Sequence, residues 1–112
     1  MAMPHAGPAE VIDIRPLGTR LKDARTITLL KTDAFEVIRL VLPAGKELKP
    51  HQVSGEITVQ CLEGRVAFYT VGAECELLAG NLLYLAAADS HALRAIEDSS
   101  LLVTILFKHE AI

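Results

Sequence analysis

The chain has 112 residues, of which 51% are hydrophobic and 22% charged, and its formal net charge is -3 at pH 7. That length allows one domain with a single core. The acidic balance, the scattered basic residues and the absence of Trp argue against nucleic acid as a partner, and no apolar run approaches the roughly 18 residues of a membrane span.

The first residues lack the basic region and apolar core of a secretory signal, so we expect no membrane partner and a cytoplasmic location. The hydrophobic fraction is high for so small a chain. Because a small domain often buries such an excess against a copy of itself, we expect a homodimer.

Residues 1–10 are rich in Pro, Gly and Ala and are predicted to form a flexible tail, followed by a single domain over residues 11–112. Short apolar or alternating runs separated by turn residues follow one another along that domain. Strands are predicted over residues 11–14, 26–32, 35–42, 57–62, 65–71, 82–86, 91–96 and 101–107. Residues 17–25 are the least strand-like part and are compatible with one short turn of helix.

The turn between two of these runs is the dipeptide Glu63-Gly64, where glycine can adopt a positive φ. Apolar residues do not recur at helical spacing over three turns in any segment. Many short, evenly spaced strands predict an all-β sandwich or barrel.

Two histidines each follow a glycine at a short distance along the chain. His51 follows Gly45 after five intervening residues, and His91 follows Gly80 in the same way at a longer interval. Neutral imidazole is a common ligand of transition metals, so two histidines from distant strands can hold a metal where they meet inside a barrel.

These two stretches resemble the two sequence motifs of the cupin family, and the resemblance extends over residues 35–107. It implies an all-β, double-stranded β-helix (jelly-roll) barrel with a cavity between two sheets. It also implies a divalent transition metal (Zn, Fe, Ni or Mn) and a small-molecule ligand, as in cupin dioxygenases, isomerases and decarboxylases. The alternative is a metal-free module that binds or senses a small molecule without catalysis, so the sequence leaves open whether the protein is an enzyme.

The sequence departs from the cupin pattern at two ligand positions. The family's second histidine is Val53 here, and an isopropyl group cannot ligate a metal. No acid occupies the family's glutamate position, and the nearest one, Glu56, comes one or two residues early. His51 and His91 are the ligands that stay in register.

Side-chain alternation along residues 57–62 allows two registers. In one, Gln60 faces the interior; in the other, Cys61 does, and the pocket wall is apolar with one thiol. We favour the first, because the amide oxygen of Gln60 suits a hard or borderline metal. The predicted metal ligands are therefore His51, Gln60, His91 and Glu56, and the further predicted pocket residues are Tyr84, Cys61 and Val53.

Overall fold

The structure is a computed structural model that describes residues 5–51, 55–87 and 89–107, with side chains at all of these positions except 50 and 51. This part of the chain forms one short 3-10 helix and nine strands. In chain order they are η1 (Gly18–Asp23), β1 (Ile27–Lys31), β2 (Phe35–Leu42), β3 (Glu47–His51), β4 (Ile57–Glu63), β5 (Arg65–Thr70), β6 (Ala73–Leu78), β7 (Leu82–Leu85), β8 (His91–Ala95) and β9 (Ser99–Leu106).

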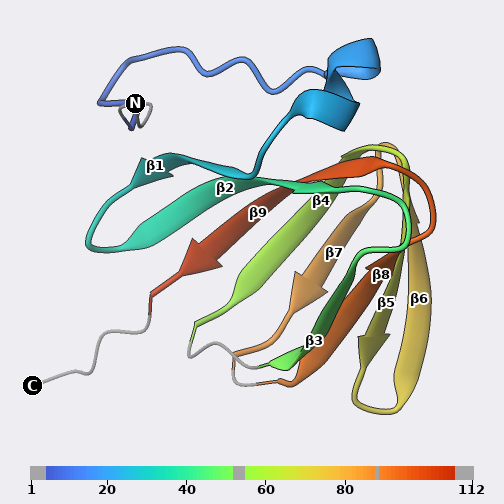
Figure 1. Cartoon of the computed structure of the whole chain (residues 1–112). Helices are drawn as coiled ribbons and strands as arrows, with labels where there is room; N and C mark the ends of the chain where they lie inside the picture. Colours follow the sequence, from blue (N-terminus) through green and yellow to red (C-terminus); the bar gives the residue numbers. More distant parts are fainter. Residues whose placement is uncertain (1–4, 52–54, 88, 108–112) are drawn as a thin grey trace, which may run out of the picture.

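The strands form two sheets with antiparallel pairing throughout the described ladders. Five strands in the order β1-β2-β9-β4-β7 make the first sheet, and four in the order β3-β8-β5-β6 make the second. The two sheets face each other, and the N-terminal segment lies over the outside of the first sheet near β1 and β2 (Figure 1). The predicted all-β jelly-roll is confirmed.

The core fills the space between the two sheets. Along β8 and most of β4 every second residue is buried there, because side chains alternate between the two faces of a strand. The buried apolar cluster consists of Leu42, Ile57, Val59, Cys61, Val66, Phe68, Leu77, Leu85, Leu93, Ala95 and Leu101. No helix in the described ranges is long and apolar enough to cross a membrane.

The turn predicted at Glu63-Gly64 connects the two sheets, because β4 lies in one and β5 in the other. Gly64 has a φ of +91°, and a Cβ at this position would lie only 2.4 Å from the carbonyl oxygen of Asp98. Glycine is therefore required here both for the backbone conformation and for space.

Residues 11–14 do not form the predicted strand. The carbonyl groups of Asp13 and Arg15 instead accept hydrogen bonds from the Arg39 guanidinium, so a side chain takes the place of a neighbouring strand as their partner. Nearer the N-terminus, Ala6 donates its N–H to the carbonyl of Leu29, so the backbone of the N-terminal segment also contacts β1 of the first sheet.

Two strands were not singled out by the sequence pattern. β3 contains Pro50, and β6 is exposed at all but one position. Both are edge strands of the four-stranded sheet, where proline is tolerated and apolar alternation is weak. The turn of helix predicted within residues 17–25 is confirmed as η1.

Candidate functional site

Strand β4 adopts the second of the two predicted registers, in which Cys61 faces the interior. Ile57, Val59 and Cys61 are buried in the core, whereas Gln60 lies on the opposite face of the strand. The expectation that Gln60 faces the interior is therefore wrong. A one-residue shift would expose three apolar side chains to water, and their burial outweighs any gain from a single amide.

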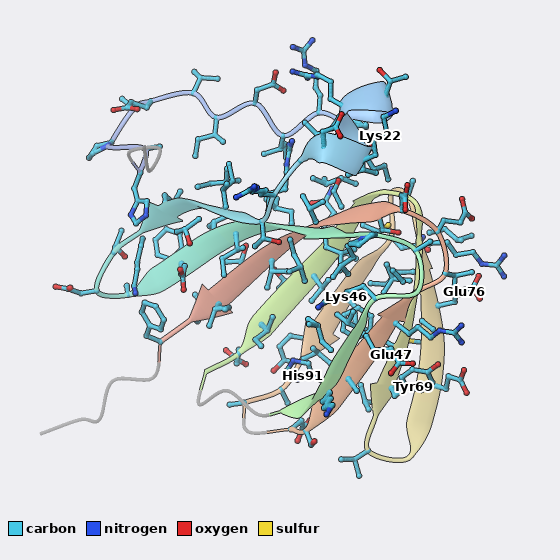
Figure 2. The ribbon with its side chains drawn as sticks, viewed as in Figure 1. Lys22, Lys46, Glu47, Tyr69, Glu76 and His91 are labelled. Atoms are coloured by element: carbon cyan, nitrogen blue, oxygen red, sulfur yellow. The ribbon has the colours of Figure 1, made fainter. Side chains whose placement is uncertain are left out.

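A cavity of about 80 Å³ lies between the sheets. It is lined by Leu40, Leu48, Ile57, Val59, Phe68, His91, Leu93, Leu101, Val103 and Ile105. His91 is the one polar side chain among these lining residues and is 6% exposed. Figure 2 shows His91 in the space between the two sheets. Among the described side chains, the cavity is therefore an apolar cup whose wall carries the imidazole of His91.

The His91 ring is oriented by a contact with the backbone just before β8. Its Nδ1 lies 3.3 Å from the carbonyl oxygen of Asp89. A carbonyl can only accept a hydrogen bond, so Nδ1 carries the proton and donates. In the neutral ring Nε2 then keeps its lone pair and can accept a hydrogen bond or bind a metal.

His51 and His91 are direct partners in the ladder between β3 and β8. Directly opposed positions of an antiparallel pair share one face of the sheet. The two histidine positions are thus brought together by the backbone register, as the spacing of the two motifs predicts.

Glu56 and Tyr84 lie outside the cup. Tyr84 is 58% exposed, and its hydroxyl donates a hydrogen bond to Oε1 of Glu56 at 2.6 Å. This hydrogen bond is the main reason why the pKa of Tyr84 is raised above its ordinary value, with smaller contributions from burial and nearby carboxylates. Neither residue is placed to contact a molecule in the cavity. Val53 lies outside the described residues.

Cys61 is fully buried in the apolar core. Burial raises the pKa of its thiol, and the thiol donates a hydrogen bond to the carbonyl oxygen of Glu63 at 3.5 Å. A thiol with a raised pKa stays protonated and is a poor nucleophile and a poor metal ligand. Cys61 therefore serves as a core residue.

The predicted four-residue metal centre is not assembled by the described side chains. Gln60 and Glu56 lie away from the cup, and the described residues contain no group of three or more His, Cys, Asp or Glu that could hold a metal ion. A catalytic zinc site uses three protein ligands. The described donors therefore do not fit a metal centre of that kind.

Sequence reasoning missed the aliphatic lining that β2 and β9 provide, represented by Leu40, Val103 and Ile105. The signal was present as a nearly continuous apolar run in both segments. It could not be interpreted without the strand order, which places β2 and β9 side by side.

No protein-family model matches the chain, and no curated protein matches its sequence. Solved structures do match. A cupin superfamily protein from Desulfitobacterium hafniense superposes with a TM-score of 0.75 at 17% identity, covering 88% of this chain and 95% of that one. An RmlC-like cupin from Desulfovibrio desulfuricans gives 0.70 at 27% identity, covering 87% and 97%.

A salicylate 1,2-dioxygenase variant from Pseudoaminobacter salicylatoxidans also superposes, with a TM-score of 0.67 at 18% identity. That match covers 71% of this chain and only 25% of the dioxygenase. The likeness to the dioxygenase is a likeness of fold. Together the matches confirm the fold that the two motifs predict.

Proposed function

We propose that this small cupin domain binds a small, mostly apolar molecule with one hydrogen-bonding group in the cavity between its sheets. The observation that supports the proposal is the buried imidazole of His91 in a wall whose other described lining side chains are aliphatic or aromatic. Ligand pockets typically combine a largely apolar lining with a few polar groups that orient the ligand.

The cavity volume limits the size of the ligand. An apolar cavity of roughly 150 Å³ holds a benzene molecule, and the cavity here is about 80 Å³. We therefore expect it to accept a molecule of a few heavy atoms, or one end of a longer molecule.

The tautomer of His91 determines which polar group of a ligand it can bind. With Nδ1 donating to Asp89, the remaining nitrogen Nε2 is an acceptor. An imidazole in this tautomer accepts a hydrogen bond from a hydroxyl, and the hydrocarbon part of a ligand gains about 25 cal/mol for each Å² of apolar surface buried. A short-chain alcohol group fits this combination.

A metal-binding function is the second candidate, and the pairing of positions 51 and 91 across β3 and β8 favours it. The weakness of this candidate is its donor set. Two imidazoles fall short of the three protein ligands of a typical catalytic zinc site, and the described residues offer no third donor inside the cup.

Methyl NMR spectroscopy during titration with isobutanol tests the proposal. We expect saturable shifts confined to the methyl groups of cavity residues such as Leu101 and Val103. His91→Leu, which removes the acceptor and keeps an apolar wall, should weaken binding about tenfold, the loss expected for one hydrogen bond.

The matched pair Val103→Phe and Thr104→Phe controls for indirect effects. Val103 lines the cavity, whereas Thr104 follows it on the other face of β9, so the first substitution should abolish the titration and the second should leave it intact. Unshifted cavity methyls in the wild-type protein, or equal binding by both variants, would contradict the proposal.

A further inference from the structure

Arg39 is buried on the outside of the first sheet. It lies in the middle of β2, where its neighbour Leu40 faces the cup, so alternation directs Arg39 to the opposite face. The N-terminal segment passes over this part of the sheet (Figure 1) and leaves Arg39 only 6% exposed. An arginine is rarely buried to this extent unless its charge is paired.

The hydrogen bonds of Arg39 satisfy only part of its guanidinium. Nη2 donates to the carbonyl oxygens of Asp13 at 3.3 Å and Arg15 at 3.2 Å. Nε is buried and has no acceptor among the described residues. Both observed partners are neutral carbonyls, so the positive charge has no ion-pair partner within the described part of the chain.

Two carboxylates that interact electrostatically with Arg39 already accept hydrogen bonds from other groups. Asp13 forms a bidentate pair with Arg15, with an Nη2–Oδ2 distance of 2.8 Å. Glu63 accepts hydrogen bonds from the Ser100 hydroxyl and from the backbone N–H groups of Leu17 and Gly18. Both carboxylates interact electrostatically with Arg39, but among the described contacts neither accepts a hydrogen bond from its guanidinium, and an incompletely hydrogen-bonded buried cation is costly.

A hollow of about 500 Å³ opens beside Arg39, between the N-terminal segment and the sheet. Its lining residues are Asp13, Arg15, Pro16, Leu17, Arg20 and Arg39. Three of them are arginines and one is an acid, and Arg20 makes no ion pair within the described residues. The hollow is large enough for a small organic molecule rather than a lone ion.

We propose that this hollow binds an organic anion through a carboxylate or phosphate group, held by Arg39 and Arg20. Guanidinium groups bind both kinds of oxyanion through paired hydrogen bonds, and a bound anion would supply the hydrogen-bonded anionic partner that Arg39 lacks among the described residues. The site is separate from the cup, which lies on the other face of the same sheet, so each proposal can fail without the other.

The alternative role for Arg39 is purely structural, as a tie for the N-terminal segment. The two roles differ in what other residues should do. In the structural role, Arg20 and the charge of Asp13 have no effect on anions. In a binding site, Arg20 attracts the anion and the Asp13 carboxylate repels it, so their removal acts in opposite directions.

Titration with succinate and with inorganic phosphate at constant ionic strength tests the proposal, with the Nε–H signal of Arg39 followed by ¹⁵N NMR. We expect saturable shifts of this signal and of the Gly18 amide with at least one of the two anions. Preference for phosphate would indicate a phosphorylated ligand, and preference for succinate a carboxylate ligand; either supports the site.

Variants complete the test. Arg20→Gln should weaken binding about tenfold, as expected for the loss of a charge-assisted hydrogen bond. Asp13→Asn should strengthen it, and Arg94→Gln, on the four-stranded sheet, should leave it unchanged. Absence of saturation with both anions, the same shifts with chloride, or unaltered binding by Arg20→Gln would overturn the proposal.

Discussion

The two faces of the five-stranded sheet show how one set of strands builds two different environments. On the inner face, apolar side chains enclose a cavity with the His91 imidazole in its wall. On the outer face, beneath the N-terminal segment, Arg39 and Glu63 hold the backbone of residues 13–18 with charged groups. Adjacent residues such as Arg39 and Leu40 belong to opposite environments, because the side-chain period of a strand is two.

A register irregularity changes the direction of Glu63. Alternation from Cys61 would turn Glu63 inward, but Cys61 pairs with Leu101 and Glu63 pairs with the very next residue, Ser100. One residue of β4, Leu62, is thus extra, as in a β-bulge. The bulge releases the carboxylate to the outer face, where it binds Ser100 and the start of η1.

The largest effect is expected on the inner face. Leu101→Ala removes a fully buried side chain from a central strand and should lower the free energy of unfolding by about 3–4 kcal/mol. Leu82→Ala, at a position that is 66% exposed on edge strand β7, should change it by about 0.5 kcal/mol or less. Urea unfolding of the two variants measures this difference, and equal losses would contradict the assigned faces.

A smaller loss is expected from the outer face. Glu63→Gln replaces a charged acceptor of three hydrogen bonds by a neutral amide and should cost about 1–2 kcal/mol at neutral pH. Glu74→Gln is the matched control, because Glu74 is exposed and belongs to edge strand β6. A Glu63 variant as stable as the control would show that the hydrogen bonds to η1 contribute little.

The stability of the protein should also depend on pH through Glu63. Burial alone would raise the pKa of this carboxyl, but hydrogen bonds from Ser100, Leu17 and Gly18 more than offset it, so the pKa is lowered. A lowered pKa in the folded state contributes stability that is complete above the ordinary glutamate value of about 4.3 and is lost as the pH falls through the lowered value. Unfolding of Glu63→Gln should show a shallower fall in this acidic range than the wild-type protein.

The smallest effect concerns reactivity rather than stability. Cys61 is buried with a raised pKa, whereas Cys75 is exposed on β6. Iodoacetamide should therefore modify the native protein at Cys75 and leave Cys61 unmodified, and both thiols should react after denaturation. Mass spectrometry of the native Cys75→Ser variant provides the control: rapid modification of Cys61 in it would show that the inner face is open to solvent.

Local signals in the sequence were sufficient for much of the fold. The strands β1 and β2 and the glycine turn at Gly64 follow from short-range patterns and are confirmed. The edge strands β3 and β6 were not identified, because edge strands bury little and show weak alternation.

The candidate site depended on information that a local pattern does not contain. His91 was identified from its spacing after Gly80. Both registers of β4 place plausible side chains inward, and only packing against Leu101 decides between them. The burial of Arg39 depends on residues 13–15, far away in the sequence. The ligand role of His51, the homodimer and the cytoplasmic location stay predictions.

The proposal for the cup is that it binds a small organic molecule rather than a metal. Elemental mass spectrometry tests it on protein incubated separately with excess zinc, iron, nickel or manganese and then desalted, beside the His51→Ala, His91→Ala double variant. We expect metal contents that are well below one atom per chain and equal in both proteins. A near-stoichiometric metal content that disappears in the double variant would contradict it.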